Sequence, residues 1–559
     1  MLKDDNTQVR ERRIITAALP YANGELHLGH IASTYLPSDI FSRYSRLAGH
    51  EVIFTCATDD YGTPILVQAE SENKDPKDYV KYWNQRDLED FSKLNIKFDL
   101  FDRTSSEENH EMAKRFFLSL FKKGLIYEGE VLQYYCTNCK RFLPDRYVIG
   151  RCPFCKAENQ YADVCENCGK TLKPGELEVP RCAVCGSTPI LEKTSHYFFA
   201  LSKFSDQLKK WLVGTETLQK DIKNYVLKWI EEGLQDWDIT RDISWGIPIP
   251  LKEAKGKVLY GWFENHLCYI STTLKFLKNK TPDAVAYWNS AKIYHFIGKD
   301  IVYHHYLFLP AERMAEGSFK LPEYIPTRGH LLLHGKKFSK SRRWYVSLRE
   351  FLESFPEDYL RFYLAYITPS NQSDVNFDWD HFKSRINEEL IGVLGNFFYR
   401  STSFIWTRYG GLVPSPSSFD ELDENLISDI NNVPIKVGNL MERIALDEAL
   451  KVILEMGRSC NQYFQHKAPW KGDERGPTAL YLSVNAVRSL AILLYPFIPN
   501  SMLNLWSSLN LERGLESETW ESARTLCINP NHKINRPVIL FNKITEEQIK
   551  TQKDKLPKE

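Results

Sequence analysis

The sequence predicts a multidomain α/β + α fold: a split parallel-sheet α/β domain, a cysteine-rich insertion within it, and an all-α bundle after it. Strand and helix patterns alternate on both sides of residues 127–236, four Cys-x-x-Cys pairs lie inside that segment, and strand patterns fade after about residue 387. With 559 residues, the chain is also too long for one hydrophobic core.

The first half of the α/β domain is expected over residues 1–126. Residues 13–18 are typical of a buried strand, a loop containing Pro20 and Gly24 follows, and a helix is expected at about 28–47. Residues 51–56 predict the second strand. Strands that alternate with helices indicate a parallel, Rossmann-type sheet, whose ligand site lies at the carboxyl ends of the strands.

The insertion, residues 127–236, is predicted to bind metal. Its Cys-x-x-Cys pairs are Cys136/Cys139, Cys152/Cys155, Cys165/Cys168 and Cys182/Cys185. The N-terminus lacks an export signal, cytosolic thiols stay reduced, and this spacing presents two thiolates to one tetrahedral ion. We expect zinc rather than iron, in closed four-thiolate sites that have a structural role. The spacing alone leaves sequential and nested pairing of the doublets open.

The rest of the chain is divided into four further regions. Residues 237–335 are expected to complete the sheet, with a strand at 292–297 followed by Gly298-Lys299-Asp300 and a helix. A loop and linker region at 336–386 leads to a helical bundle at 387–545, where apolar residues between 449 and 456 follow helical spacing. Residues 546–559 are charged, and we expect them to form a frayed tail.

A first chemical motif, His27-Leu28-Gly29-His30, lies where the loop after the first strand passes into a helix. Backbone amides at a helix N-terminus favour phosphate, and Gly29 removes a side chain where a nucleotide must approach closely. Two imidazoles on one helical turn could donate hydrogen bonds to an α-phosphate as its charge grows in a transition state. Alone, the motif is also compatible with a surface loop.

A second motif, Lys337-Phe338-Ser339-Lys340-Ser341, follows Gly335-Lys336 in a loop rich in donors. Its two lysines are suited to neutralising the β- and γ-phosphates as pyrophosphate leaves. Alone, it could equally be a solvated basic loop. The two motifs in this order, 310 residues apart, are far more specific than either one.

The pair matches the signature of class I aminoacyl-tRNA synthetases. Further segments narrow the match to one family within this class. They are the paired cysteines and residues 18–24 (Ala-Leu-Pro-Tyr-Ala-Asn-Gly), 237–242 (Trp-Asp-Ile-Thr-Arg-Asp) and 295–301 (His-Phe-Ile-Gly-Lys-Asp-Ile). From about residue 13 to 529 the chain resembles the methionyl-tRNA synthetases. The resemblance implies ATP-dependent activation of methionine to methionyl-adenylate and transfer to the 3′-terminal ribose of tRNA(Met), for translation initiation and elongation.

The resemblance also assigns roles by position. The family's amino-acid pocket falls on Leu19, Tyr21, Trp262, Tyr269, Ile301 and His305, and its ammonium-binding carboxylate on Asp59. The ATP site falls on Gly29, Gly298, Asp300, Lys337, Ser339 and Lys340, with His27, His30, Lys337 and Lys340 as the catalytic residues. Mg²⁺ is expected with ATP, because polyphosphate charge needs a hard cation.

This chain departs from the family pattern beside the pocket. Glu264-Asn265-His266 stands where the family usually has Asp-Ala-Pro, Tyr61 where a His is common, and Arg343 where a Gly is usual. Asn265 and His266 either face the substrate side chain, where polar groups could shift its preference, or point away into the surroundings of the pocket. The alternative function is therefore a methionyl-tRNA synthetase paralogue with altered amino-acid or acceptor specificity.

The resemblance bears on the cysteines and on the bundle. Family members with one zinc keep the inner four cysteines, which favours nested pairing: Cys152/Cys155/Cys165/Cys168 on one ion and Cys136/Cys139/Cys182/Cys185 on the other.

In the bundle, Asn396, Arg400 and Trp470 resemble the family's anticodon-reading positions. Amide and guanidinium groups read the edges of unstacked bases, and an aromatic ring stacks on them.

The composition and length of the chain limit which partners and which cellular location we expect. Lys+Arg and Asp+Glu are equal at 72 each, so RNA binding must rest on local patches rather than on a whole-protein field. We expect a cytoplasmic protein with no membrane contact, because no run approaches the ~18 apolar residues of a membrane span. We also expect a monomer, because the chain ends soon after the bundle. A zinc-dependent scaffold with a dead catalytic domain would predict damaged His and Lys motifs, and both are intact.

Overall fold

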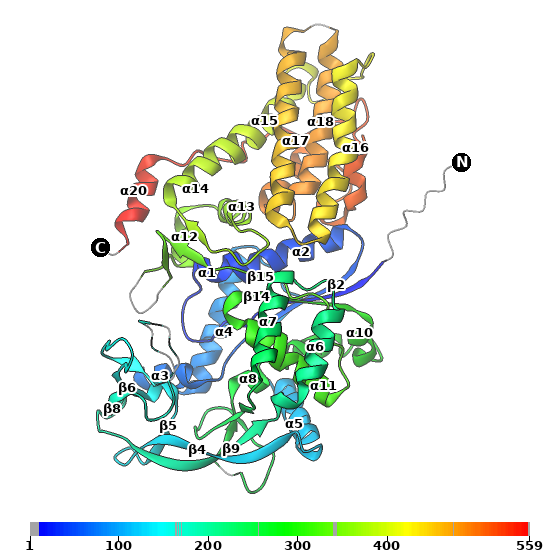
Figure 1. The fold of residues 1–559 in the computed structure, drawn as a ribbon. Helices are drawn as coiled ribbons and strands as arrows, with labels where there is room; N and C mark the ends of the chain where they lie inside the picture. Colours follow the sequence, from blue (N-terminus) through cyan, green and yellow to red (C-terminus); the bar gives the residue numbers. More distant parts are fainter. Residues whose placement is uncertain are drawn as a thin grey trace.

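The fold is that of a computed structural model, which describes residues 10–162, 165, 167–168, 170, 172–254, 256–338, 344–472 and 474–556. A parallel sheet with its helices occupies the middle of the molecule (Figure 1). A helical bundle stands on one side of it, and a long two-stranded ribbon with a small cysteine-rich lobe lies on the other. The predicted fold class is therefore confirmed.

The central sheet has five strands in the order β15-β14-β1-β2-β3, all paired in parallel. The strands are β1 (Arg12–Ala17), β2 (Glu51–Thr58), β3 (Leu100–Arg103), β14 (Lys292–Gly298) and β15 (Thr327–Arg328). The two halves of the domain meet where β1 pairs with β14, although 274 residues separate the ends of these strands. Because the strand order reverses there, a crevice for ligands is expected at the carboxyl ends of β1 and β14.

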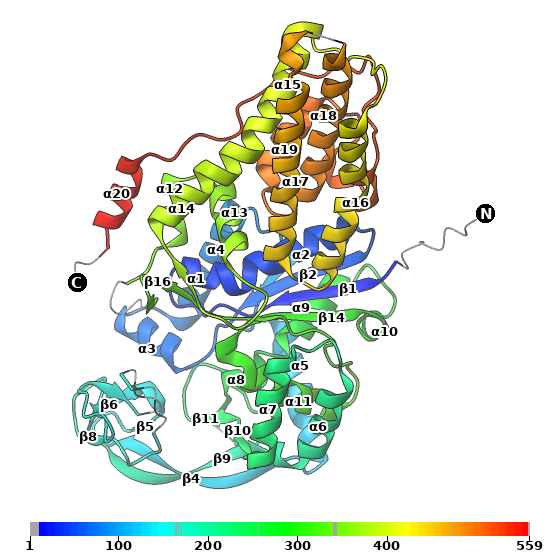
Figure 2. The same cartoon turned by 45° about the horizontal axis from the view of Figure 1, so that its top comes forward.

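Helices cover both faces of the sheet. The segment after β1 is helical as predicted, but it consists of α1 (Leu28–His30), the π-helical η1 (Ile31–Tyr35) and α2 (Leu36–Leu47). α2 lies on the bundle side of the sheet, and α9 (Cys268–Leu277) lies on the opposite side (Figure 2). The remaining helices of this domain are α3 (Thr63–Ser71), α4 (Pro76–Lys93), α5 (Glu107–Lys122), α8 (Gly261–Glu264), α10 (Ala284–Ser290), the π-helical η5 (His304–Phe308) and α11 (Leu309–Glu316).

The insertion is built on a ribbon of β4 (Ile126–Cys136) and β9 (Ile190–Phe199), which pair antiparallel from Ile126↔Phe199 to Tyr135↔Ile190. β5 (Arg141–Leu143) and β10 (Trp237–Asp238) extend this sheet. A second small sheet contains β6 (Val148–Arg151), β7 (Gln160–Tyr161) and β8 (Glu178–Cys182). Two helices, α6 (Ser205–Gly214) and α7 (Lys220–Glu232), return the chain toward the parallel sheet. β11 (Thr240–Arg241), β12 (Ile247–Pro248) and β13 (Val258–Leu259) follow.

A linker region joins the sheet to the bundle. It contains a three-stranded sheet of β16 (Leu331–Leu333), β17 (Lys336–Lys337) and β18 (Val375–Phe377), with α12 (Leu348–Ser354) and α13 (Glu357–Ile367). α14 (Trp379–Arg385) then continues through the π-helical η6 (Ile386–Gly395) into α15 (Asn396–Tyr409). The predicted domain boundary at residue 387 lies inside this continuous helical stretch.

The bundle consists of α15, α16 (Glu421–Glu442), α17 (Leu446–Lys467), α18 (Arg475–Leu494) and α19 (Pro499–Leu509). Among the described residues, α18 is the one helix whose length and composition would allow it to cross a membrane, and its side chains are buried in the core of the bundle. Packing of apolar faces is therefore what holds these helices together.

A buried ionic cluster fixes the bundle against the sheet domain. Asp39 on α2 accepts from Arg43 Nε at 2.8 Å and from Arg361 Nη2 at 2.7 Å. Arg361 Nε also donates to the carbonyl of Phe497, and Arg43 Nη1 to the hydroxyl of Tyr495. A buried carboxylate with two guanidiniums is tolerated only when such hydrogen bonds satisfy all three groups, so the cluster fixes one arrangement of the two domains.

The prediction of a frayed C-terminal tail is wrong for residues Glu546–Asp554, while residues 557–559 of that tail lie outside the described residues. Residues Glu546–Asp554 form α20, which begins with a reciprocal capping box between Thr545 and Gln548. Ile549 is buried, and Lys553 Nζ lies 2.6 Å from Asp380 Oδ2 on α14. The capping residues could have been recognised in the sequence, but the apolar surface under Ile549 is supplied by residues far away in the chain.

Candidate active site and metal centres

One cavity of about 430 Å³ opens at the carboxyl ends of β1, β2 and β14. It brings together all of the described residues that were predicted for the amino acid, the nucleotide and the catalytic step. They are Leu19, Tyr21, His27, Gly29, His30, Asp59, Trp262, Tyr269, Gly298, Asp300, Ile301, His305 and Lys337. The predicted residues Ser339 and Lys340 lie outside the described residues. The cavity therefore joins loops from both halves of the split sheet.

The two predicted motifs meet in this cavity. The rings of His27 and His30 stack with their centroids 3.6 Å apart, and the ring of Phe338 lies against the ring of His27 at 5.0 Å. Leu28 N–H donates to the carbonyl of Val346 at 3.2 Å, and Leu348 N–H to that of Leu26 at 2.9 Å. The backbone beyond the second motif is thus tied to the first motif.

The hydrogen bond of His30 identifies which of its ring nitrogens can donate. The backbone N–H of His27 donates to His30 Nδ1 at 3.2 Å, so Nδ1 is an acceptor. In a neutral imidazole the other nitrogen then carries the proton. His30 therefore presents Nε2–H as a hydrogen-bond donor, and its ring lines the cavity.

Two glycines allow close approach at the nucleotide end of the cavity. A Cβ on Gly29 would lie 3.0 Å from the ring of His27. A Cβ on Gly298 would lie 2.5 Å from Asp300 Oδ1 and 3.9 Å from Ser33 Oγ. Asp300 is exposed to the cavity, and the missing side chain at Gly298 leaves room for its carboxylate.

Asp59 is the buried carboxylate of the cavity. It follows β2, its Oδ1 accepts from the backbone N–H of Tyr61 at 3.2 Å, and its Oδ2 accepts from Asn265 Nδ2 at 3.2 Å. Burial raises the pKa of Asp59 to about 7. A cationic group that entered the cavity would be attracted by this carboxylate and would lower its pKa again, because opposite charges favour ionisation.

Aromatic rings also line the cavity. His305 Nδ1–H donates to the carbonyl of Ile301 at 3.1 Å, and burial lowers the pKa of His305 to about 4. His305 is therefore neutral, and its Nε2 accepts from the hydroxyl of Tyr269 at 2.9 Å. The ring of Trp262 stacks on His304 with centroids 3.6 Å apart. This wall is suited to an apolar, polarisable side chain.

The unusual segment 264–266 takes part in the cavity. Asn265 and His266 both line it, so the alternative in which both point away is wrong. Glu264 is directed elsewhere, with Oε2 accepting from Asn109 Nδ2 at 3.1 Å. Burial, and then the neighbouring Asp59 and Asp60, hold the pKa of Glu264 well above its ordinary value.

Several cavity residues were missed by sequence reasoning: Ser33, Thr34, Tyr35, His330 and Phe338. Phe338 lies inside the second motif but had no assigned role. Ser33, Thr34 and Tyr35 belong to the π-helical η1, and the predicted cavity residue His305 belongs to the π-helical η5. π-helical turns widen a helix locally and are frequent at functional sites, but they have no simple sequence pattern.

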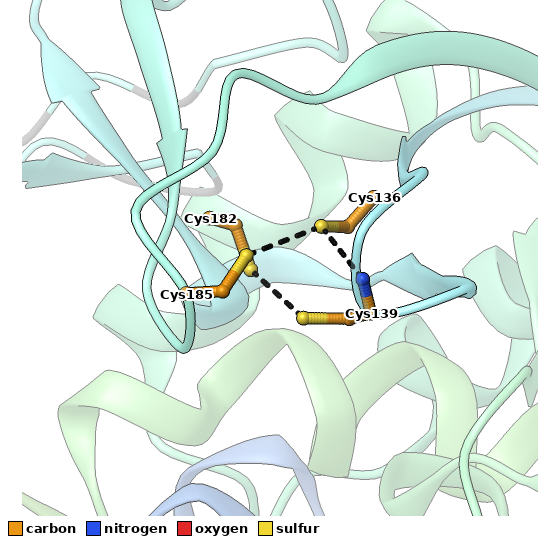
Figure 3. Close-up of side chains that lie close together, drawn as sticks. All are labelled: Cys136, Cys139, Cys182 and Cys185. Atoms are coloured by element: carbon orange, nitrogen blue, oxygen red, sulfur yellow. Dashed lines mark hydrogen bonds between the residues drawn. The ribbon is translucent and has the colours of Figure 1, made fainter.

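The cysteines form two groups with nested pairing. Cys136, Cys139, Cys182 and Cys185 make one group, and Cys152, Cys155, Cys165 and Cys168 the other; within each group the sulfurs lie within 4.8 Å of one another. Figure 3 shows the first group, in which two turns from distant parts of the insertion direct their sulfurs toward one another. The structure therefore excludes sequential pairing of the Cys-x-x-Cys doublets.

The spacing of the sulfurs fits zinc. Tetrahedral Zn–S bonds of about 2.3 Å place sulfurs about 3.8 Å apart. The observed Sγ–Sγ distances are 3.5 Å for Cys136–Cys185, 3.9 Å for Cys139–Cys182, 3.9 Å for Cys152–Cys168 and 3.5 Å for Cys155–Cys165. These distances are far longer than the ~2.05 Å of a disulfide. Both groups can hold a metal ion with four thiolates. Such an ion has no open coordination position for water or substrate, so its role is structural.

Metal analysis of paired variants tests the nested sites. The wild type is expected to hold about two zinc ions per chain, and C136S/C155S about none, because this double variant breaks both nested sites. The matched variant C136S/C185S removes two ligands of one nested site and is expected to retain about one zinc ion. Sequential pairing predicts the reverse, with more zinc in C136S/C155S than in C136S/C185S.

The three predicted anticodon-reading residues lie on the bundle. Asn396 is exposed at the start of α15, and Arg400 lies one turn later. The Arg400 guanidinium is 5.2 Å from the ring centroid of Trp470, in the turn between α17 and α18. This turn is at the end of the bundle that lies away from the parallel sheet (Figure 1). The three side chains provide an amide, a guanidinium and a half-buried ring.

Two family models match the chain. Residues 13–402 match "tRNA synthetases class I (M)", and residues 413–557 match "Anticodon binding domain of methionyl tRNA ligase". The methionine–tRNA ligase of Methanobrevibacter smithii is 42% identical over 548 residues, which are 97% of this chain and 82% of that protein. The methionine–tRNA ligase of Pyrococcus furiosus is 42% identical over 559 residues, covering 96% and 76%.

The fold also has solved counterparts. The crystal structure of methionyl-tRNA synthetase from Mycobacterium tuberculosis, bound by methionyl-adenylate, superposes with a TM-score of 0.79 and covers 95% of this chain and 100% of that chain. The two sequences are 24% identical, so this likeness concerns the fold.

Proposed function

Because this chain belongs to the class I methionyl-tRNA synthetase family, we propose that it activates methionine with ATP and transfers the methionyl group to tRNA(Met). The observation that carries the proposal is the single cavity in which the His and Lys motifs, the buried Asp59 and the aromatic wall converge. The alternative, altered amino-acid or acceptor specificity, is less favoured, because relatives 42% identical over nearly the whole chain are methionine–tRNA ligases.

In the first step, a carboxylate oxygen of methionine attacks the α-phosphorus of ATP. The bond from that phosphorus to the bridging oxygen of the β-phosphate breaks, which gives methionyl-adenylate and pyrophosphate. Asp59 holds the ammonium of methionine, and the aromatic wall of Trp262, Tyr269 and His305 holds its side chain. This fixes the carboxylate next to the nucleotide, so that orientation lowers the barrier.

The first motif stabilises the transition state of this step. The Nε2–H of His30 donates to an α-phosphate oxygen, where negative charge grows as the new bond forms. His27 keeps the ring of His30 in place by stacking on it. Lys337 attracts the leaving pyrophosphate, together with the predicted Lys340 and Ser339. Mg²⁺, which accompanies ATP, would supply further charge neutralisation on the phosphates.

In the second step, a hydroxyl of the 3′-terminal ribose of tRNA attacks the carbonyl carbon of the adenylate, and AMP leaves. Asn396, Arg400 and Trp470 select the tRNA by its anticodon, with Trp470 as the stacking ring and the other two reading base edges. Zinc bound by the two groups of four cysteines would stiffen the insertion. We place this enzyme in the cytoplasm, where it serves initiation and elongation of translation.

The test is ATP–pyrophosphate exchange with each standard amino acid, followed by aminoacylation of a tRNA(Met) transcript. Methionine is expected to drive exchange, and the other amino acids are expected to be much weaker. Exchange driven by another amino acid, with methionine inert, would identify the paralogue instead. Exchange without charging of tRNA(Met) would place the altered specificity in the acceptor.

A glycine variant tests the nucleotide end of the cavity. The change G298A is expected to raise KM for ATP about ten- to hundredfold, because its Cβ would displace the carboxylate of Asp300, a residue predicted for the ATP site. The KM for methionine should change little. The control is G214A, where an added Cβ meets no atom within 4 Å among the described residues. Equal KM values for ATP in both variants would refute the role of Gly298.

A further inference from the structure

A second cavity, of about 340 Å³, lies where the sheet domain, the insertion and the bundle meet. Sites for small molecules begin at about 300 Å³. The walls of this interdomain cavity include Gln219 before α7, Tyr324 and Arg328 at β15, Ser370 after α13, and Arg443 and Ile444 in the turn between α16 and α17. Among the described residues, none lines both this cavity and the catalytic one. The proposed reaction therefore leaves the interdomain cavity unused.

Arg328 is a buried cation in the wall of the interdomain cavity, with an exposed fraction of 2%. Its Nη2 donates to the carbonyl of Ile444 at 3.2 Å, which is its one side-chain hydrogen bond among the described residues. A guanidinium has five N–H donors. Within the described part of the chain Arg328 forms no ion pair, and the neighbouring Asp447 is paired with Lys451 at 3.0 Å. Because a buried charge is costly unless it is paired, Arg328 points to an anionic partner in the cavity.

The charges around the interdomain cavity favour an anion. Burial lowers the pKa of Arg328 to about 10, although the charge of Asp447 acts in the opposite direction, so the guanidinium stays charged at neutral pH. Arg443 adds an exposed cation to the wall. Among the described lining residues Glu442 is the one carboxylate, and its Oε2 accepts from Arg13 Nη2 at 2.7 Å. That negative charge is compensated, while the charge of Arg328 is not.

The remaining surface of the interdomain cavity is largely apolar. Ile325, Pro326 and Ile444 line it, and the ring of Tyr324 adds an aromatic face that is fixed by stacking on Tyr294 with centroids 4.3 Å apart. An inorganic ion would leave these groups uncovered. The combination of an unpaired guanidinium with apolar walls therefore fits an organic anion.

Hydrogen bonds fasten the walls of the interdomain cavity to one another. Gln219 Nε2 donates to the carbonyls of Ser370 at 2.8 Å and Thr327 at 3.1 Å, and its Oε1 accepts from the N–H of Thr327 at 2.9 Å. The bond from Arg328 to Ile444 ties β15 to the turn of the bundle. The cavity is thus preformed, as small-molecule sites usually are.

We propose that the interdomain cavity binds a small organic carboxylate, with its carboxylate on the guanidinium of Arg328 and its apolar body against Ile325, Pro326 and Ile444. Arginine binds carboxylates with two parallel hydrogen bonds, which also fixes their orientation. The proposal does not depend on the proposed function. Because the walls come from the sheet domain, the insertion and the bundle, a bound ligand stabilises the arrangement of all three and raises Tm.

The experiment titrates the full chain with benzoate and follows binding by saturation-transfer NMR and by Tm. Methionine and ATP are present at saturation, so that the catalytic cavity is filled. Benzoate is expected to bind saturably and to raise Tm. Benzamide, which has the ring without the charge, and inorganic phosphate, which has the charge without an apolar body, are expected to bind at least about tenfold more weakly.

Two variants test the interdomain cavity from opposite walls. R328M keeps the length of the side chain without its charge, and S370F fills the cavity without touching the guanidinium. Each is expected to raise the Kd for benzoate at least about tenfold. The matched control is Arg488, which is 3% exposed, is paired with Glu518 at 3.2 Å and does not line the cavity.

R488M is expected to keep the wild-type Kd for benzoate but to lower Tm more than R328M does. It leaves the buried carboxylate of Glu518 without its partner, whereas R328M removes a charge that has none. Displacement of benzoate by methionine and ATP, an equal Kd for benzamide, or no saturable binding to the wild type would overturn the proposal. A wild-type Kd in S370F, or a Tm in R328M as low as in R488M, would overturn it as well.

Discussion

Replacing Asp59 by Asn is expected to raise KM for methionine about 10²- to 10³-fold in ATP–pyrophosphate exchange. Asn has the size of Asp and keeps an acceptor for the N–H of Tyr61, but it has no charge for the substrate ammonium. Removing one partner of a buried, hydrogen-bonded charge pair costs about 2–5 kcal/mol, and the expected rise, which equals about 2.7–4.1 kcal/mol, lies within that interval. KM for ATP should change far less, because Asp59 follows β2 at the amino-acid end of the cavity.

The pH dependence of KM for methionine tests directly whether the charge of Asp59 binds the substrate. Burial raises the pKa of Asp59 to about 7, so the carboxylate is increasingly protonated as the pH falls below 7. The neutral acid attracts ammonium weakly, so wild-type KM for methionine should rise as pH falls from 8 to 6, approaching about tenfold per unit below the pKa. In D59N this rise should disappear.

The neighbouring residue provides the control for Asp59. Asp60 is equally buried, but its Oδ1 accepts from the hydroxyl of Thr58 at 2.7 Å and its Oδ2 from that of Ser105. D60N is therefore expected to change Tm more than KM for methionine. If D59N kept a wild-type KM, or if D60N raised KM as much as D59N, Asp59 would not be the ammonium-binding group.

Replacing His30 by Ala is expected to lower kcat of exchange about 10²- to 10³-fold, with KM for ATP and methionine changed only a few-fold. The reason is that the Nε2–H donor stabilises charge that appears only in the transition state. Losing such an interaction lowers kcat and leaves substrate binding nearly unchanged. Steady-state exchange at saturating substrates measures it. Because His27 stacks on His30, the double variant H27A/H30A should lose less than the product of the two single losses.

The control for His30 is a buried histidine elsewhere in the domain. His50 accepts from the backbone N–H of Glu11 at 3.3 Å and lies 3.7 Å from Glu442, next to the start of β2 rather than at its carboxyl end. H50A is expected to lower Tm and to leave kcat near the wild-type value. A wild-type kcat in H30A would remove His30 from the catalytic step.

Much of the candidate site could be predicted because its chemistry is local in the sequence. His27 and His30 are one helical turn apart, and Gly298 ends the strand that Asp300 follows two residues later. The alternation of strands and helices then places these segments at one edge of a parallel sheet, since parallel strands end at the same edge. The resemblance to a family supplied the roles of the pocket residues, and the structure gathers the described ones around one cavity.

Other features depend on contacts that no local pattern contains. The spacing of the cysteines allowed two pairings, and the antiparallel ribbon of β4 and β9 decides between them by bringing Cys136 and Cys139 next to Cys182 and Cys185. Residues Glu546–Asp554 are helical because Ile549 finds an apolar surface, not because of their composition. Sequence patterns report propensity, whereas burial depends on the rest of the molecule.

By itself, the sequence determined which chemical groups this protein brings to its sites: the two histidines of the first motif, the lysines of the second motif, the carboxylate of Asp59 and four pairs of cysteines. Only the tertiary structure decided how they are used. It stacks Phe338 on His27, commits the hydroxyl of Tyr269 to His305, and leaves His266 unpartnered in the cavity wall. The physical reason is that hydrogen-bond direction, tautomer and burial depend on neighbours that are distant in the chain and are brought together by folding.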